Sequence, residues 1–597
     1  MTSENKICQN CKQKFVIEPE DFNFYQKIQV PPPTFCPRCR LQRRFAFRND
    51  RTLFKRKCGR CEKDIISIYH KDNPYVVYCQ ACWWSDAWDP LEYGAEYDFK
   101  KTFFEQFDAL LKRTPIMANF VVDESRMFQS TYNNMVLDLK NCYLLTNSDF
   151  NEDCFYGCEL EKSKNCADTN LVNESELCYE IVNCQKCYRV FWSEDCEACN
   201  DVWFSRDLRG CQSCFGCVCL RNKKYYIFNE PYTKEEYEKK LRQFNLTSYL
   251  NIEKYKAESR EIWRKSLHKC IHGIHNINVS GDYIYNSKNT YNSWIVYGGE
   301  DNKYLQYQVA PPTKDCYDFS QFGAGAELSY EILQGGNGIS RVRGSWFVLS
   351  DSQDIDYAIQ VMGSSYLFGC VSLRKKKYCV LNKQYSKEEY ETLRDKIIKQ
   401  MGEIPFKGNS GRIYRYGEFF PAEISPFAYN ETTAQEYFRL SKEEIEELGY
   451  KKWREPEGRN YKITLPADEL PDTIGVVEDS ITGEIISCAH QTECTHSCTK
   501  AFRIIGAEFG FYKQLGIPLP HLCPNCRHAE RLELRNPPFT WERKCMCSGE
   551  IDYSNVYRNT IVHFHGDALC PNEFETSYAP ERPEIVYCEQ CYNAEVV

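Results

Sequence analysis

The chain has 597 residues, 35 of them cysteine, and a formal net charge of -9. This length exceeds one hydrophobic core and predicts about three to five domains. The negative charge excludes wholesale wrapping of nucleic acid, which leaves only local basic patches. No apolar run approaches the roughly 18–20 residues of a membrane span, and the first residues lack the basic and apolar regions of a signal peptide. We therefore expect a cytoplasmic protein with reduced thiols and no membrane partner, in which Cys-x-x-Cys pairs indicate metal binding.

Four Cys-x-x-Cys pairs open the chain. They consist of Cys8, Cys11, Cys36, Cys39, Cys58, Cys61, Cys79 and Cys82. A thiolate pair on a tight turn supplies half of a tetrahedral zinc site, and a second pair completes it. The pattern predicts a double zinc-ribbon module over residues 1–92. We expect sequential pairing, although a cross-braced arrangement would use the same residues. Iron–sulfur binding suits such regular pairs less well, and a thioredoxin-like dithiol would need only one pair.

The C-terminal region is a copy of this module. "PTFCPRCR" matches "PHLCPNCR", and the segment from Cys11 to Cys58 aligns without a gap against Cys498 to Cys545. We predict a second double zinc-ribbon module over residues 486–597. Its expected ligands are Cys494, Cys498, Cys523, Cys526, Cys545, Cys547, Cys588 and Cys591. The predicted cofactor is about four zinc ions per chain, in closed sites that fold the protein rather than catalyse a reaction.

Basic residues crowd the N-terminal module around its second pair. The candidates for nucleic-acid contact are Arg38, Arg40, Arg43, Arg44, Arg48, Arg51, Lys55 and Arg56. If the second pair opens a short helix, Arg40, Arg44 and Arg48 share one face of it. Such a face could bind a phosphate backbone. It could equally be a solvated surface, or it could offset the negative charge of the thiolate centres.

The middle of the chain repeats cysteine at fixed intervals. The series is Cys142, Cys154, Cys166 and Cys178, followed by Cys187, Cys199 and Cys211. The step is 12 residues with one step of 9, which is typical of a solenoid whose equivalent positions stack. We predict a cysteine-rich β-solenoid with a capping helix over residues 126–250, with a coil of 24 or 12 residues. Its cysteines are interpreted as small core residues, with additional metal binding as the alternative.

A second copy of the solenoid follows over residues 280–402. "FGCVCLRNKKYYIFNE" returns as "FGCVSLRKKKYCVLNK", and tyrosines replace most of the cysteines. Thr233 to Glu236 and Ser386 to Glu389 are capping boxes that open helices expected to cover the solenoid ends. The remaining segments are an amphipathic helix and linker (93–125), a helical linker (251–279) and a linker with a helix (403–485). The predicted fold class is mixed and mainly β: two tandem β-solenoid repeats with helical caps, flanked by duplicated double zinc-ribbon modules.

The order of these motifs resembles a family of multi-zinc-ribbon proteins from candidate-phyla-radiation bacteria. The resemblance rests on "CPRCRLQRR", "KRKCGRCEK", "YCQACWWSDAWDP" and "LRNKKYYIFN", and it extends over nearly the whole chain. It implies a bacterial, cytoplasmic protein that binds metal through its N-terminal cysteine pairs. It implies no function, because none is established for the family. The second solenoid departs from the family's cysteine-rich pattern.

Three functions compete at this level. The first is a zinc-binding protein that binds nucleic acid, most plausibly RNA, through the N-terminal basic residues. The second is a protein–protein interaction scaffold whose aromatic-rich faces bind a protein partner. The third is a β-helix enzyme acting on carbohydrate, for which no acidic pair stands out and "VHFHGD" is an isolated histidine pair. The sequence favours a non-enzymatic protein and leaves its oligomeric state open.

Overall fold

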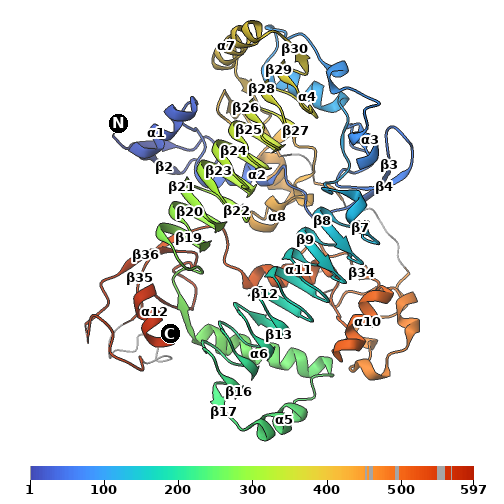
Figure 1. Ribbon diagram of the computed structural model, residues 1–597, viewed down its shortest axis with the longest axis vertical. Coiled ribbons are helices and arrows are strands. Elements are labelled where there is room, and N and C mark those ends of the chain that lie inside the picture. The colour runs from blue at the N-terminus through green and yellow to red at the C-terminus, as the bar shows by residue number, and fades with distance from the viewer. Residues whose placement is uncertain (1, 451–452, 456–461, 491–495, 548–558, 567) are drawn as a thin grey trace.

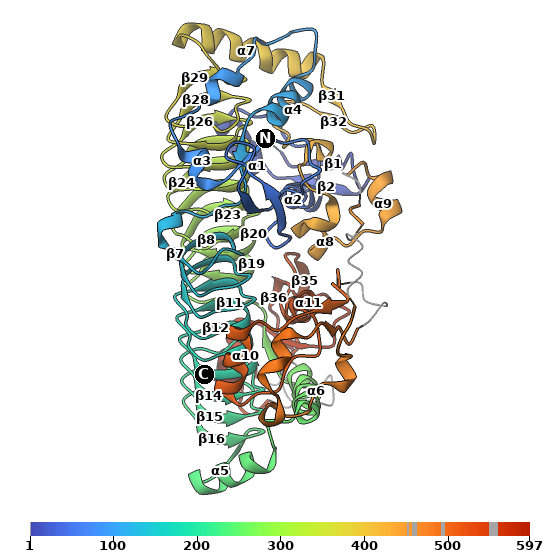
Figure 2. The same ribbon diagram turned by 90° about the vertical axis from the view of Figure 1, so that its right-hand side faces the viewer.

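A computed structural model describes residues 2–450, 453–455, 462–490, 496–547, 559–566 and 568–597. Within them the protein is mainly β, with two large, predominantly parallel sheets and twelve α-helices. The expectation of a mainly β fold is therefore confirmed. Figures 1 and 2 show the two sheets as stacks that together form a long wall, with helices and small hairpins over one side of it. None of the described helices combines the length and apolarity that crossing a membrane requires.

The first stack is an eleven-stranded sheet in which each strand lies beside the next in sequence. Its strands are β7 (Met127–Phe128), β8 (Asn134–Lys140), β9 (Thr146–Glu152), β10 (Cys158–Glu161), β11 (Ala167–Asn173), β12 (Tyr179–Gln185), β13 (Tyr188–Glu194), β14 (Asn200–Trp203), β15 (Gln212–Phe215), β16 (Lys224–Ile227) and β17 (Glu230–Pro231). Pairing is parallel from β7 to β16, and Ala167 pairs with Tyr179, twelve residues further on. The register therefore matches the 12-residue step of the sequence.

Left-handed backbone recurs at every third residue of this stack. The series runs from Met135 to Phe228, with φ between about 45° and 65° throughout. Aspartate and asparagine are frequent in it because their short polar side chains tolerate this conformation best among non-glycine residues. Some of them also pair between successive steps: the Asn183 amide donates to Asp195 at 2.7 Å. The sharp bend at every third residue keeps each step of the stack short.

The residue after most of these left-handed positions lies in the core. Cys142, Cys154, Cys166 and Cys178 occupy such positions, and all are buried. Each thiol donates to carbonyl oxygens two residues back and nine residues ahead, as Cys166 does at 3.3 Å and 3.5 Å. Cys187 follows Cys178 by nine residues, which is a multiple of three, so its side chain also points into the core. These contacts support the interpretation of the cysteines as small core residues.

The second stack repeats the plan with a less regular step, which is wider than 12 residues in its middle strands. Its strands are β19 (Ile277–Tyr285), β20 (Lys288–Tyr297), β21 (Gly299–Lys303), β22 (Gln306–Gln308), β23 (Thr313–Phe322), β24 (Ala326–Gly336), β25 (Ser340–Leu349), β26 (Gln353–Asp356), β27 (Ile359–Met362), β28 (Ser365–Phe368), β29 (Lys377–Val380) and β30 (Lys383–Gln384). Thr313 pairs with Ala326, thirteen residues further on. The core here includes Phe319 and Ile332, so larger side chains fill the space that cysteine fills in the first stack.

Helices close the outer ends of both stacks and link them. Both predicted capping boxes are present, at Thr233 with Glu236 and at Ser386 with Glu389. They open α5 (Lys234–Gln243) beside β16 and α7 (Lys387–Glu403) beside β29, at opposite ends of the molecule (Figure 1). The other connecting helices are α4 (Phe103–Arg113), α6 (Tyr249–Lys265), α8 (Thr433–Tyr437) and α9 (Lys442–Glu447).

The two cysteine-rich ends of the chain fold into hairpins and short helices. The N-terminal region contains β1 (Glu4–Ile7), β2 (Lys14–Ile17), α1 (Pro19–Ile28), α2 (Pro37–Phe45), β3 (Phe54–Lys57), β4 (Asp64–Ser67), β5 (Val77–Tyr78) and α3 (Gln80–Trp84). The C-terminal region contains β33 (Ile486–Ser487), β34 (Ala501–Phe502), α10 (Gly506–Leu515), α11 (Pro524–Leu534), β35 (Trp541–Lys544), β36 (Glu573–Thr576), β37 (Ile585–Tyr587) and α12 (Glu589–Val596). The duplication seen in the sequence thus extends to the order of the elements.

These two regions pack crosswise on the stacks. The N-terminal α1 and α2 contact β23 and β24 of the second stack, whereas the C-terminal α11 contacts β11 and β12 of the first (Figure 1). The matching motifs "DFNFY" and "EFGFY" supply aromatic contacts on both sides. Phe24 stacks on Tyr317 with ring centroids 3.9 Å apart, and Tyr512 meets Tyr179 edge-on at 5.7 Å. The helices α2 and α11 therefore each pack on the stack that is farther from them in sequence.

Truncation of a core cysteine tests the packing interpretation. We expect Cys166→Ala to lower the free energy of unfolding by about 1–3 kcal/mol, because it removes a small buried side chain. Leu160→Ala, at a neighbouring core position, should cost more, about 2–5 kcal/mol. Chemical denaturation measures both. Bound metal, measured on the same samples, should not change, and a loss of metal from Cys166→Ala would show that the core cysteines are ligands.

Candidate metal centres

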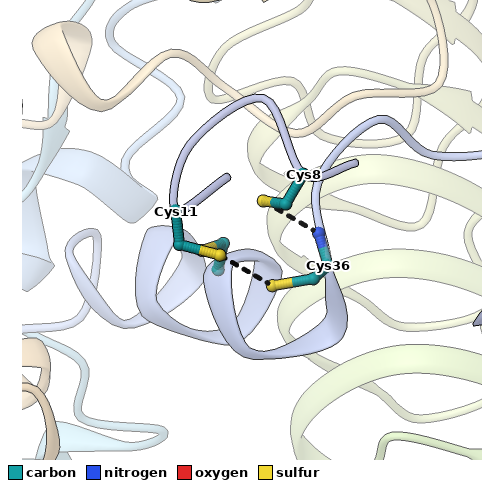
Figure 3. A group of neighbouring side chains, drawn as sticks. Cys8, Cys11 and Cys36 are labelled. Atoms are coloured by element: carbon teal, nitrogen blue, oxygen red, sulfur yellow. Dashed lines mark hydrogen bonds between the residues drawn. The ribbon is translucent and has the colours of Figure 1, made fainter. Parts of the chain in front are cut away.

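The first cysteine tetrad joins a hairpin turn to the start of a helix. Cys8 and Cys11 lie in the turn between β1 and β2, and Cys36 and Cys39 lie at the N-terminus of α2. Figure 3 shows the Cys11 and Cys36 sulfurs facing each other, 3.7 Å apart, and the Cys36 backbone N–H donating to the Cys8 sulfur at 3.3 Å. All four Sγ atoms lie within 4.8 Å of one another. This tetrad can hold one metal ion.

The second tetrad repeats this geometry with the sequentially next pairs. Cys58 and Cys61 lie in the turn between β3 and β4, and Cys79 and Cys82 lie at the start of α3. The Cys79 backbone N–H donates to the Cys58 sulfur at 3.3 Å, and the Cys61 and Cys79 sulfurs are 3.9 Å apart. The structure thus groups the eight N-terminal cysteines sequentially, without cross-bracing.

The third tetrad contains a cysteine, Cys488, that the sequence analysis did not predict as a ligand. Cys488 joins Cys498, Cys523 and Cys526, and the Cys523 backbone N–H donates to the Cys488 sulfur at 3.3 Å. The sequence comparison had placed Cys494 in this site, but Cys494 lies outside the described residues. Cys488 follows β33 as Cys8 follows β1, so the turn of the C-terminal copy is longer than that of the first. The short spacing from Cys494 to Cys498 is typical of a ligand pair, so the sequence predicted Cys494, and not the more distant Cys488, as the partner of Cys498.

The fourth tetrad also differs from the predicted set. It consists of Cys545, Cys570, Cys588 and Cys591, so Cys570 completes it instead of Cys547. The Cys588 backbone N–H donates to the Cys545 sulfur at 3.2 Å, and Cys570 lies 3.7 Å from Cys591. Cys570 precedes Cys588 by 18 residues, as Cys61 precedes Cys79, so it is the counterpart of Cys61. The insertion that separates Cys570 from Cys547 hid this correspondence in the sequence. Cys547 lies in a neighbouring group with His563 and His565.

Each tetrad contains at least one thiol that ionises easily. Hydrogen bonds from neighbouring thiols lower the pKa of Cys8 well below its usual range, and they lower that of Cys588 to about 4. A hydrogen bond from Cys498 helps to lower the pKa of Cys488 to about 6. Burial raises the pKa of Cys58, but the backbone N–H groups of Cys61 and Cys79 outweigh it and lower the value to about 6. Thiolates are the form that binds metal.

The arginines next to the first tetrad do not face solvent. Arg40, Arg43, Arg44 and Arg48 are at most 3% exposed. The Asp318 carboxylate accepts from Arg40 at 2.8 Å and from Arg44 at 3.0 Å. The prediction that these four side chains contact nucleic acid is therefore wrong: α2 turns its basic face into the second stack, where carboxylates already neutralise it.

Two further carboxylates complete this buried network. Glu331 accepts from Arg43 at 2.6 Å and from Arg44 at 2.8 Å, and Glu418 accepts from Arg43 at 3.1 Å. Burial opposes the charged form of Arg43, but these two carboxylates raise its pKa above the ordinary value. Removing any one partner would leave a charge in the interior without its counterion.

The C-terminal copy makes the equivalent contacts with the first stack. Arg527 and Arg531, which align with Arg40 and Arg44, both donate to Asp168. Arg535 donates to Glu159 at 2.7 Å. All three arginines are buried, so both copies of the helix dock through the same arrangement of charges.

The other predicted nucleic-acid residues lie nearer the surface and are dispersed. Arg38 is exposed and stacks over Phe539 at 4.4 Å, and Lys55 is exposed. Arg51 and Arg56 are half-buried, and Arg56 donates to the carbonyl oxygen of His70 at 3.2 Å. No continuous basic face remains among the eight predicted side chains.

Comparisons with known proteins identify no family. No family model matches the chain, and no curated protein matches it. Seven chains of solved structures do match, among them a "putative acetyltransferase from Desulfovibrio desulfuricans G20" at 10% identity, over 47% of this chain and 75% of the other. Its TM-score of 0.10 is too low to carry any argument. Membership of the zinc-ribbon family remains a prediction.

The corrected ligand set is tested by serine substitutions. We expect Cys488→Ser to lower the bound metal by one ion per chain, because it breaks the third tetrad. Cys494→Ser should leave the metal content unchanged, because that tetrad is complete without it. Elemental analysis of the purified, folded proteins provides the measurement. Loss of metal from Cys494→Ser but not from Cys488→Ser would restore the original assignment.

Proposed function

We propose that this chain is a non-enzymatic zinc protein in which all four cysteine tetrads hold structural zinc. The proposal is carried by the donor sets: each consists of four thiols with Sγ atoms within 4.8 Å. Tetrahedral all-sulfur coordination is characteristic of structural zinc, and it leaves no open position for a substrate or water. The binding free energy of such sites is largely folding free energy.

The two parallel stacks are, in this proposal, β-solenoids with compact coils. The 12-residue register of the first stack and the left-handed residue at every third position support a coil of four short sides. The 13-residue register at Thr313 and Ala326 supports a slightly larger coil in the second. Such repeats form rigid, extended bodies because every coil contacts its neighbours.

The role of the zinc is then to orient the arginine-bearing helices. Cys36 and Cys39 fix the first turn of α2 to the β1–β2 hairpin, and Arg40 and Arg44 follow directly on the same helix. A helix without a fixed position could not keep two guanidinium groups in contact with one buried carboxylate. We infer that zinc binding positions the modules, and that the modules join the two stacks into a single scaffold.

A hollow beside α3 is the best candidate for a protein partner. Trp84 and Val122 are 44% and 49% exposed, and both line this hollow together with Asp123 and Glu124. An exposed tryptophan beside an aliphatic residue, rimmed by acids, suits a partner with an apolar anchor and basic neighbours. A nucleic-acid partner has less support, because four of the arginines proposed for it are buried and the other basic side chains are dispersed.

The docking of the N-terminal module depends on Asp318. We expect Asp318→Ala to destabilise the protein by about 3–5 kcal/mol, because it leaves Arg40 and Arg44 buried without their shared counterion. Asp315→Ala, on the same strand, is the matched control. Its carboxylate pairs with Lys27 at 2.6 Å where Lys27 is 53% exposed, so its loss should cost at most about 1 kcal/mol. Denaturant titration compares the two, and equal effects would contradict the proposed clamp.

A partner capture tests the scaffold function. The full chain should retain a protein from native lysate after nuclease treatment, and Trp84→Ala should abolish that retention while zinc content stays normal. Tyr188→Ala, which removes a similarly exposed aromatic side chain on the first stack, should retain it. Recovery of nucleic acid that is lost on nuclease treatment and unaffected by Trp84→Ala would favour nucleic-acid binding.

A further inference from the structure

A second group of ligands adjoins the fourth tetrad. The Cys547 sulfur lies 2.8 Å from Nδ1 of His563 and 3.3 Å from Nε2 of His565. The Cys591 sulfur lies 3.4 Å from the same Nε2 of His565. These four donor atoms all lie within 4.8 Å of one another. The group has two thiols and two imidazoles, a composition common in tetrahedral zinc sites.

The outer nitrogens of both imidazoles are already engaged. His563 shares a 2.8 Å contact between Nε2 and the Glu595 carboxylate, whose side chain is fully buried. His565 Nδ1 lies 2.8 Å from the carbonyl oxygen of Ala568. Donation of the outer N–H to a carboxylate or a carbonyl is the usual support for a metal-binding histidine, because it leaves the inner nitrogen with its lone pair. Here both inner nitrogens face Cys547.

Cys591 belongs to both groups. It contributes its sulfur to the tetrad with Cys545, Cys570 and Cys588, and also to the set with Cys547 and the two histidines. We propose that the C-terminal module holds a binuclear zinc centre in which the Cys591 thiolate bridges two ions. One ion is held by four sulfurs, and the other by Cys547, His563, His565 and the bridging sulfur. The second dication also offsets the negative charge of the all-thiolate site.

The duplicated half of the chain offers an internal comparison. In the N-terminal module, Cys58 and Cys61 both belong to the same tetrad. The segment from Cys58 to Cys79 is about half as long as that from Cys545 to Cys588. The longer C-terminal segment supplies Cys570 to the tetrad. It thereby leaves Cys547 available to the two histidines, and both histidines lie in the same segment. The N-terminal module is therefore expected to bind two ions and the C-terminal module three.

Metal stoichiometry tests this inference directly. We expect about five zinc ions per chain in the wild-type protein, and one fewer in Cys547→Ser and in the double variant His563→Ala with His565→Ala. His565→Cys should retain the fifth ion, because a thiolate can replace the imidazole. His275→Ala, at an exposed histidine that is not among the proposed ligands, is the neutral control. Glu595→Gln should weaken binding of the fifth ion about 10–100-fold while leaving the other four.

The proposed bridging sulfur of Cys591 can be detected by nuclear magnetic resonance of bound cadmium. In protein loaded with cadmium-113, two resonances should show mutual coupling through the shared sulfur, and the coupling should vanish in Cys547→Ser, in which one of the two ions is lost. A wild-type stoichiometry of four, unchanged by Cys547→Ser, would overturn the proposal and leave the four tetrads intact. Five ions without coupled resonances would overturn the bridge. The cadmium spectrum of the wild-type protein decides the matter even if a variant fails to fold.

Discussion

The position of both cysteine modules on the stacks depends on two shared aspartates, Asp168 and Asp318. Each lies in a parallel stack, and each accepts from two arginines that stand one helical turn apart on a helix of a cysteine module. Burial of an ion pair costs desolvation free energy, which is recovered only when the geometry is good and the remaining donors are satisfied. The pairs therefore define position more than they add stability: a helix that is shifted or rotated leaves charges in the interior without counterions. Because both copies use the same arrangement, the docking mode belongs to the duplicated unit.

The narrow core of the first stack explains its composition. A bend at every third residue leaves one inward-facing side chain on each short side, and cysteine fits such a position while its thiol donates to backbone carbonyls. Serine meets the same need at Ser163 and Ser175, whose hydroxyls donate to carbonyl oxygens at 2.9 Å. The chain therefore uses cysteine in two unrelated ways. In the core it is a compact donor, and in the end modules it forms tetrads that can hold metal.

Much of this architecture could be predicted from the sequence, because local signals were strong. The 12-residue step, the capping boxes and the N-terminal tetrads all follow from spacing alone. The environment of the arginines did not follow, because the i, i+4, i+8 pattern of Arg40, Arg44 and Arg48 identifies a face of a helix but not what covers it. The carboxylate that Arg40 and Arg44 share lies 278 and 274 residues away in sequence. The roles of Cys488 and Cys570 were missed for a different reason: insertions separate them from the block between Cys498 and Cys545 that aligns without a gap, so the alignment did not extend to them.

The packing of α2 and α11 on distant stacks affects the order in which the protein can fold. Each tetrad consists of cysteines from one terminal region, so metal binding would not depend on ligands from the rest of the chain. The docks join segments hundreds of residues apart, 363 residues in the case of Arg531 and Asp168, and closing such loops is entropically costly. A helix whose first turn is already fixed by metal would reduce that cost, because its arginines would be in place when the module reaches the stack. The two docks cross, since α2 docks on the second stack and α11 docks on the first. Neither half of the chain contains both an arginine-bearing helix and the stack on which it docks, so both docks form only when the two halves fold together.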